Sequence, residues 1–168
     1  ARRSTAMAAE GETARLVGST PAAEPEEDPL EGHSVILFDG VCLLCSKFIH
    51  FVLDHDPAER FKFATLQSDF AVELMEKHGI KPDLSTVVVV DEAGAHVRST
   101  AALRVLLHCG SPYNILYYAF IWVPAPLRDL GYKAVAASRY QVFGKDETVC
   151  RRFTKDMRRR FLSPPSAA

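Results

Sequence analysis

Two cysteines, Cys42 and Cys45, lie three positions apart where an apolar run gives way to a helical pattern. The run ends at Phe38, and a short turn separates it from the cysteines. Backbone N–H groups at a helix N-terminus favour negative charge, so we expect the first thiol to have a lowered pKa. The second thiol lies about one helical turn further on, within reach for a disulfide. This spacing predicts a redox-active pair.

Each cysteine has an expected role in such a pair. Cys42 is the candidate nucleophile, because only a thiolate attacks a disulfide and the pKa of Cys42 is expected to be lowered. Its sulfur is also expected to be the more exposed of the two. Cys45 would resolve the mixed disulfide by attacking Cys42. The residues between them, Leu43 and Leu44, predict an apolar surface beside the reactive sulfur. The alternative is two packed thiols without a chemical role.

Asp39 lies three residues before Cys42, at the end of the apolar run. A carboxylate held there can be partly buried with a raised pKa, and it could then accept the proton of Cys45. In the alternative interpretation its oxygens accept bonds from the backbone N–H groups of the turn. The sequence leaves both roles for Asp39 open.

A metal site is the competing use of these thiols. The two cysteines could join Cys109, Cys150 or a histidine around zinc or an iron–sulfur cluster, but zinc sites commonly pair C-x₂-C with a second close-spaced pair. The sequence has no second pair. We therefore predict no metal and no organic cofactor. Cys109 is expected to be a small core residue and Cys150 a neutral structural thiol.

Strand and helix patterns alternate around these residues. The valine run ending at Val90 is followed by a turn and a returning strand, which together predict a hairpin. A helix capped by Ser99 or Thr100 and ended by Gly110 follows. The order is β-α-β-α-β-β-α, the minimal thioredoxin-like order, so we predict an α/β fold. The expected elements are strands 35–38, 61–66, 86–90 and 95–98, and helices 43–55, 69–78 and 100–109.

The rest of the chain divides into two ends of different character. Residues 1–32 are acidic and proline-rich, so we predict disorder there, with a possible transit-peptide remnant at the start. Residues 33–110 form the predicted core, residues 111–162 a helical extension packed on it, and residues 163–168 a tail. Within the extension, Pro126 suits the first turn of a helix running to about Arg139.

Charge and hydropathy limit the partners. The formal net charge is −1, so the whole chain gives no electrostatic reason to expect nucleic acid. No apolar run is long enough for a transmembrane helix. The aromatic segment 114–123 and a basic C-terminal helix are candidate surfaces for partners in an organellar complex.

Four ordered segments resemble one family. Asp39-Gly40-Val41-Cys42-x-x-Cys45 is similar to the D-x-x-C-x-x-C signature of the DCC family, which consists of thiol-disulfide oxidoreductases of bacteria and of plant and algal organelles. The similarity continues through most of the chain, from Val35 to Cys150. The other similar segments are Arg98-Ser99-Thr100-Ala101, Pro124-x-Pro126-Leu127-Arg128-Asp129, and Tyr132 to Gly144, which contains Arg139 and Tyr140.

The resemblance implies a thioredoxin-like fold and exchange of disulfides with a protein substrate. It also implies an organelle, the chloroplast rather than the mitochondrion. One departure concerns the broader thioredoxin group, where a cis-proline precedes the third strand; here Thr86 precedes the valines and Pro82 is too far back. The alternative function is a non-catalytic accessory subunit of an organellar complex.

Overall fold

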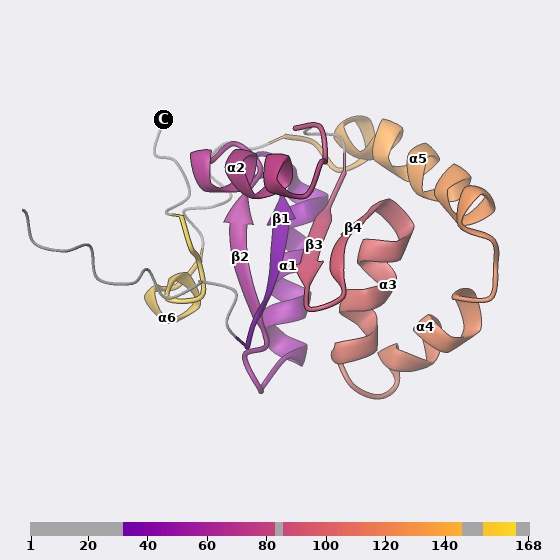
Figure 1. Ribbon diagram of the computed structural model, residues 1–168, viewed down its shortest axis with the longest axis horizontal. Helices are drawn as coiled ribbons and strands as arrows, with labels where there is room; N and C mark the ends of the chain where they lie inside the picture. The colour runs from indigo at the N-terminus through magenta and orange to yellow at the C-terminus, as the bar shows by residue number, and fades with distance from the viewer. Residues whose placement is uncertain (1–31, 83–85, 146–152, 164–168) are drawn as a thin grey trace, which may run out of the picture.

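A four-stranded mixed sheet lies at the centre of the computed structural model, which describes residues 32–82, 86–145 and 153–163. The strand order is β2-β1-β3-β4, with β1 parallel to β2 and antiparallel to β3, and β3 antiparallel to β4. The arrangement is a thioredoxin-like α/β fold (Figure 1). The elements are β1 (Ser34–Phe38), α1 (Leu43–His55), β2 (Phe61–Thr65), α2 (Asp69–Lys77), β3 (Val88–Asp91), β4 (Gly94–Val97), α3 (Arg98–His108), α4 (Tyr113–Phe120), α5 (Ala125–Val142) and α6 (Lys155–Arg158).

Helices cover both faces of the sheet. Side chains alternate across β1, so Ile36 and Phe38 pack with α1 and α3, whereas Val35 and Leu37 pack with α2. All four are fully buried. A strand covered on both faces needs an unbroken apolar run, which explains the absence of alternation in the sequence of β1.

The two helices that follow β1 and β2 begin and end close to the expected positions. Helix α1 runs from Leu43 to His55 as expected. Ser68 caps α2, where its hydroxyl accepts a bond from the Ala71 N–H at 3.2 Å. Gly79 follows this helix with φ of 66°, a conformation that glycine adopts without strain.

The expected cap of α3 is wrong. The helix begins at Arg98, and its N-cap Val97 offers no side-chain bond. The Ser99 hydroxyl, expected as a cap, instead donates to the Asp129 carboxylate of α5. Arg98 contacts the same carboxylate at 3.8 Å. The Ser99 hydroxyl is therefore used in a tertiary contact with α5 and not in the helix cap that the local sequence predicted.

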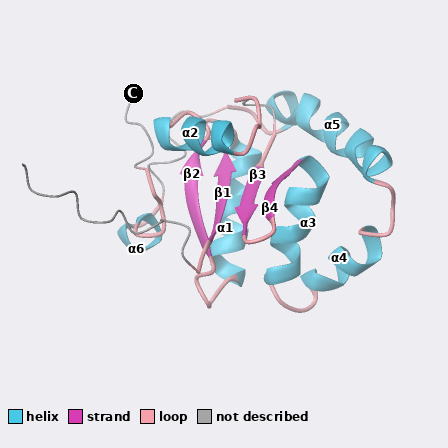
Figure 2. Ribbon diagram, viewed as in Figure 1, coloured by secondary structure: helices cyan, strands magenta, loops and turns pink. Residues whose placement is uncertain are grey.

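The extension forms two helices beside α3. Pro126 lies in the first turn of α5, as expected, and the helix continues beyond Arg139 to Val142. Figure 2 shows α4 and α5 following one another around the side of the molecule where α3 lies. In the described part of the chain, no helix is both long enough and apolar enough to cross a membrane.

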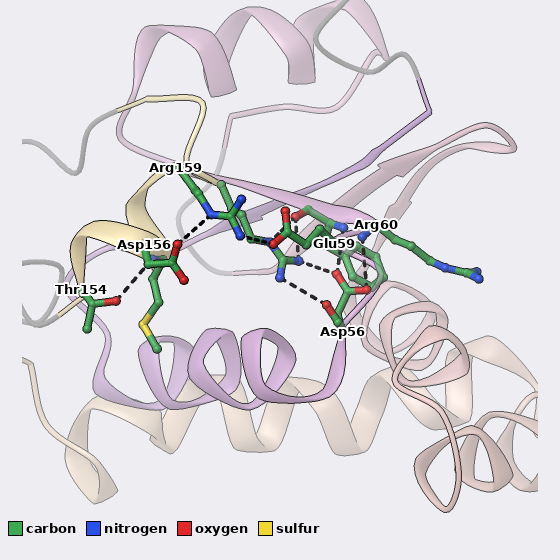
Figure 3. Close-up of polar contacts among 9 residues, drawn as sticks. Asp56, Glu59, Arg60, Thr154, Asp156 and Arg159 are labelled. Carbon is green, nitrogen blue, oxygen red and sulfur yellow. Dashed lines mark hydrogen bonds and ion pairs between the residues drawn. The ribbon is translucent and has the colours of Figure 1, made fainter.

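Among the described residues of the C-terminal segment, 153–163, the expected basic helix is present only as a short piece. Helix α6 has only four residues, and the chain then runs along the edge of β2. Phe63 donates its N–H to the Arg160 carbonyl at 2.9 Å and accepts from the Leu162 N–H at 2.8 Å. The basic side chains are used internally: Arg159 pairs with Glu59 (Figure 3). The predicted basic binding surface is therefore partly occupied by the protein itself.

A buried ion pair holds this segment. The Arg160 side chain is 5% exposed and pairs with the Asp56 carboxylate, which is 1% exposed. Arg160 also donates to the Phe61 carbonyl through Nε at 3.1 Å. Asp56 in turn accepts the Phe61 N–H at 3.1 Å, so both charges have hydrogen-bond partners.

Replacing Arg160 with alanine is expected to lower the free energy of unfolding by about 3–5 kcal/mol, because the Asp56 charge stays buried without its partner. Arg159→Ala is the matched control. Its side chain is 57% exposed, so its loss should cost less than about 1 kcal/mol. Urea denaturation measures both values. Equal losses would contradict the assignment of Arg160 as the residue that anchors the segment.

Candidate active site

The first cysteine lies at the start of α1, as the sequence predicts. Strand β1 ends at Phe38, and the Cys42 N–H donates to the Asp39 carbonyl across the turn at 3.3 Å. Cys42 is the N-cap residue, with extended backbone angles, and its carbonyl accepts the Ser46 N–H at 3.0 Å. Cys45 follows one helical turn later, and the two thiols are hydrogen-bonded.

The two sulfurs have opposite proton affinities. The hydrogen bond from Cys45 is the main cause that lowers the pKa of Cys42 to about 6, and burial opposes it. The N–H groups of Cys45 and Leu44 and the charge of Arg139 lower this pKa further, although neither N–H aligns well enough to make a regular side-chain cap. The same hydrogen bond, with burial, raises the pKa of Cys45 far above its usual range. The pair is therefore one thiolate and one thiol at neutral pH.

The expected exposure of the sulfurs is wrong. Cys42 is completely buried, whereas Cys45 is 6% exposed. The backbone of Lys145 forms an antiparallel bridge with Cys42, so the chain that follows α5 returns across the turn. The sequence pattern correctly placed Cys42 at the N-terminus of the helix. It gave no indication that Lys145, about a hundred residues further along the chain, pairs with Cys42.

Asp39 is buried at the centre of a polar network. Its Oδ1 accepts the Val41 N–H at 3.1 Å and the Gln67 amide at 2.9 Å. Its Oδ2 accepts from Arg139 at 3.2 Å and from the Tyr140 hydroxyl. The bond to Val41 is the turn-stabilising contact that the sequence allowed. The negative charge of Asp39 also contributes to the raised pKa of Cys45.

Arg139 brings α5 to the reactive pair. Its side chain is 5% exposed, pairs with Asp39, and carries the positive charge that favours the Cys42 thiolate. Tyr140 accepts from the same guanidinium at 2.9 Å. Both residues lie in the segment from Tyr132 to Gly144, which resembles the family.

Two residues of the site were missed by sequence reasoning. Gln67 follows β2, and besides bonding Asp39 it accepts the Gly40 N–H at 3.2 Å. The Tyr132 hydroxyl accepts the Val87 N–H at 3.0 Å at the start of β3. Proline has no backbone N–H, so this bond to Tyr132 could not form if the residue before β3 were a proline, as it is in the broader thioredoxin group. Tyr132 lies in a similar segment, whereas nothing local indicated Gln67.

The other thiols lie outside the pair. Cys109 ends α3 and is buried, and burial raises its pKa to about 11. Cys150 falls outside the described residues. Within the described ranges, no group of three Cys, His, Asp or Glu side chains is arranged to hold a metal ion.

An apolar cavity of about 190 Å³ opens beside Cys45. It lies between α1, α3 and α5, and Cys45 forms part of its wall. The polar side chains at its lining are Arg139 and Tyr132; aliphatic and aromatic groups supply the rest, among them Leu44 and Phe48. The apolar surface expected from the leucines is therefore present, on the Cys45 side.

Two substitutions should raise the pKa of Cys42 by different amounts. Cys45→Ala removes the main stabilising bond and should raise the pKa more than Arg139→Met, which removes a charge with a smaller effect. Because Cys42 is buried, its ionisation is followed by the ultraviolet absorbance of the thiolate and not by a reagent. This absorbance, measured against pH, should rise through an inflection near pH 6 in the native protein and at higher pH in both variants.

Cys109→Ser is the control for this titration, because Cys109 lies outside the pair and should leave the inflection in place. Circular dichroism should first establish that each variant is folded. An unchanged inflection in Cys45→Ala would contradict the assigned cause of the low pKa.

Comparison with known proteins identifies the family. The model for DCC1-like thiol-disulfide oxidoreductases matches residues 36–145. The Bacillus subtilis protein YuxK is 36% identical over 129 residues, covering 76% of this chain and 93% of YuxK. An Arabidopsis thaliana DCC family protein, named as chloroplastic, is 35% identical over 115 residues, covering 68% of this chain and 67% of the relative. No solved structure matches. The chain belongs to the DCC1-like thiol-disulfide oxidoreductase family.

Proposed function

We propose that this protein exchanges disulfides with protein substrates through Cys42 and Cys45. The observation that carries the proposal is the opposed pair of pKa values at the start of α1, with Cys42 lowered and Cys45 raised. The Cys42 thiolate is the attacking group, and the Cys45 thiol stays protonated until the second step. Because Cys42 has no exposed surface, the substrate sulfur must reach it from the Cys45 side, where the cavity opens. Family membership supports redox chemistry, and the substrate and the steps are our proposal.

The proposed exchange consists of two nucleophilic displacement steps at sulfur, which together account for the electrons transferred. The Cys42 thiolate attacks one sulfur of the substrate disulfide, which forms a mixed disulfide and expels a substrate thiolate. Cys45 then loses its proton and attacks Cys42, which expels the second substrate thiolate. Two electrons pass from the pair to the substrate, and the pair ends as a disulfide. The reverse sequence oxidises a substrate dithiol.

Asp39 is proposed as the group that accepts the Cys45 proton. Support comes from its burial beside the pair and from its contribution to the raised pKa of Cys45. Its Oδ2 already accepts from Arg139 and Tyr140, so a proton that arrives at Asp39 would weaken those bonds.

A specific observation favours a second candidate, an accessory subunit of a complex. Helices α4 and α5 and the turn between them leave large apolar side chains exposed, with Trp122 of the turn at 87% and Leu130 of α5 at 67%. Such a surface suits a partner protein. An organellar location, in the chloroplast rather than the mitochondrion, is a proposal supported by the name of the Arabidopsis relative alone, and the bacterial relative speaks against a specific organelle.

Removal of both thiols discriminates the two functions. Cys42→Ser combined with Cys45→Ser should abolish reduction of insulin or of a model disulfide, because no sulfur remains to carry the electrons. Cys109→Ser should keep the activity, since Cys109 is buried and protonated. Full biological complementation by the double variant at normal abundance would favour the accessory role.

Asp39→Asn should separate the two chemical steps. Resolution by Cys45 should slow by about a hundredfold, the usual contribution of a general base, while the first attack by Cys42 should change by less than about tenfold. Stopped-flow measurement of mixed-disulfide formation and decay reports both steps. A melting curve provides the control for folding, because Asp39 also holds the turn. Equal slowing of the two steps would sink the proton-acceptor role.

A further inference from the structure

The access route to the reactive pair is one-sided. Cys42 is paired with Lys145 through a backbone bridge and has no exposed surface. Cys45 forms part of the wall of the 190 Å³ cavity, together with Ala102 of α3 and Ala136 of α5. A group that enters this cavity therefore contacts Cys45, one of the two residues of the exchanging pair.

The size and lining of the cavity define what fits there. A cavity of about 150 Å³ lined by aliphatic side chains binds a benzene ring, so 190 Å³ accommodates a phenylalanine or leucine side chain. The small residues Ala102 and Ala136 leave this room between the helices. Most of the lining has no hydrogen-bonding group, so a polar side chain would lose its hydration without compensation.

The apolar surface continues away from the sulfurs. A second hollow of about 410 Å³ shares Ala102 and Tyr132 with the first and reaches Phe120 and Leu127. This second hollow is more open to solvent and lies between α3 and the α4–α5 connection. A polypeptide with one side chain in the first cavity can leave along this surface, whereas a small free molecule would use only the first.

We propose that the cavity seats a large apolar side chain of the polypeptide whose cysteine exchanges with the Cys42–Cys45 pair. The proposal rests on the proposed function and adds its substrate class. A polypeptide is favoured because it can place an apolar side chain in the cavity while its own sulfur reaches Cys42 past the Cys45 wall, and because it can extend into the second hollow. Substrates with phenylalanine or leucine beside the reactive cysteine are therefore preferred over those with serine or aspartate.

Two peptides with the same intramolecular disulfide test this preference, one with Phe and one with Ser beside the first cysteine. The second-order rate constant for exchange with the reduced protein should be about tenfold higher for the Phe peptide. Ala136→Phe fills the cavity and should bring the two rate constants within about twofold of each other. Ala102→Leu provides a second filling variant if the first does not fold.

Ala134→Phe is the matched control, because Ala134 is exposed on the same helix and does not line the cavity. It should leave the tenfold preference unchanged. Equal rate constants for the two peptides in the native protein would overturn the inference alone, as would a preference that survives both filling variants. Hydroxyethyl disulfide has no side chain to place in the cavity, so it tests the proposed function separately from the substrate preference. If the native protein reduced neither this compound nor either peptide, the proposed function and the inference would both be overturned.

Discussion

The buried ion pair between Arg139 and Asp39 determines the arrangement of the whole site. Two charges removed from water are tolerated only when hydrogen bonds and the opposite charge compensate them. Asp39 meets this condition with four donors from three parts of the chain, and Arg139 can reach it only if α5 lies across the end of the sheet. The position of the helical extension and the geometry of the cysteine turn therefore depend on one contact.

This contact also sets the electrostatics of the sulfurs. Arg139 favours the Cys42 thiolate, while the carboxylate of Asp39 disfavours ionisation of Cys45. The direct hydrogen bond between the sulfurs is the largest influence on both pKa values. The charge of Arg139 acts with that bond at Cys42 but against it at Cys45, where the charge of Asp39 acts with the bond. The pair thus gains its asymmetry from local helix structure and from a long-range ion pair together.

How much of the fold and of the site could be predicted from the sequence depends on how far apart along the chain the interacting residues lie. Helix α1 and the cap at Ser68 depend on neighbouring residues, and the sequence predicted both. Ser99 and the C-terminal basic residues were misjudged because distant partners, Asp129 and Asp56, take their donors. The backbone bridge between Cys42 and Lys145 could not be predicted for the same reason, since the two residues are far apart in the sequence. Resemblance indicated the segment around Arg139, but only the fold revealed its partner.

The equilibrium reduction potential of the Cys42–Cys45 pair in glutathione buffers tests the central claim most directly. A lowered pKa at Cys42 stabilises the reduced form, so the account predicts reversible disulfide formation and a potential less negative than about −270 mV, the value typical of thioredoxin. Failure to form the disulfide at any glutathione ratio, or a potential below about −300 mV as in structural disulfides, would contradict it.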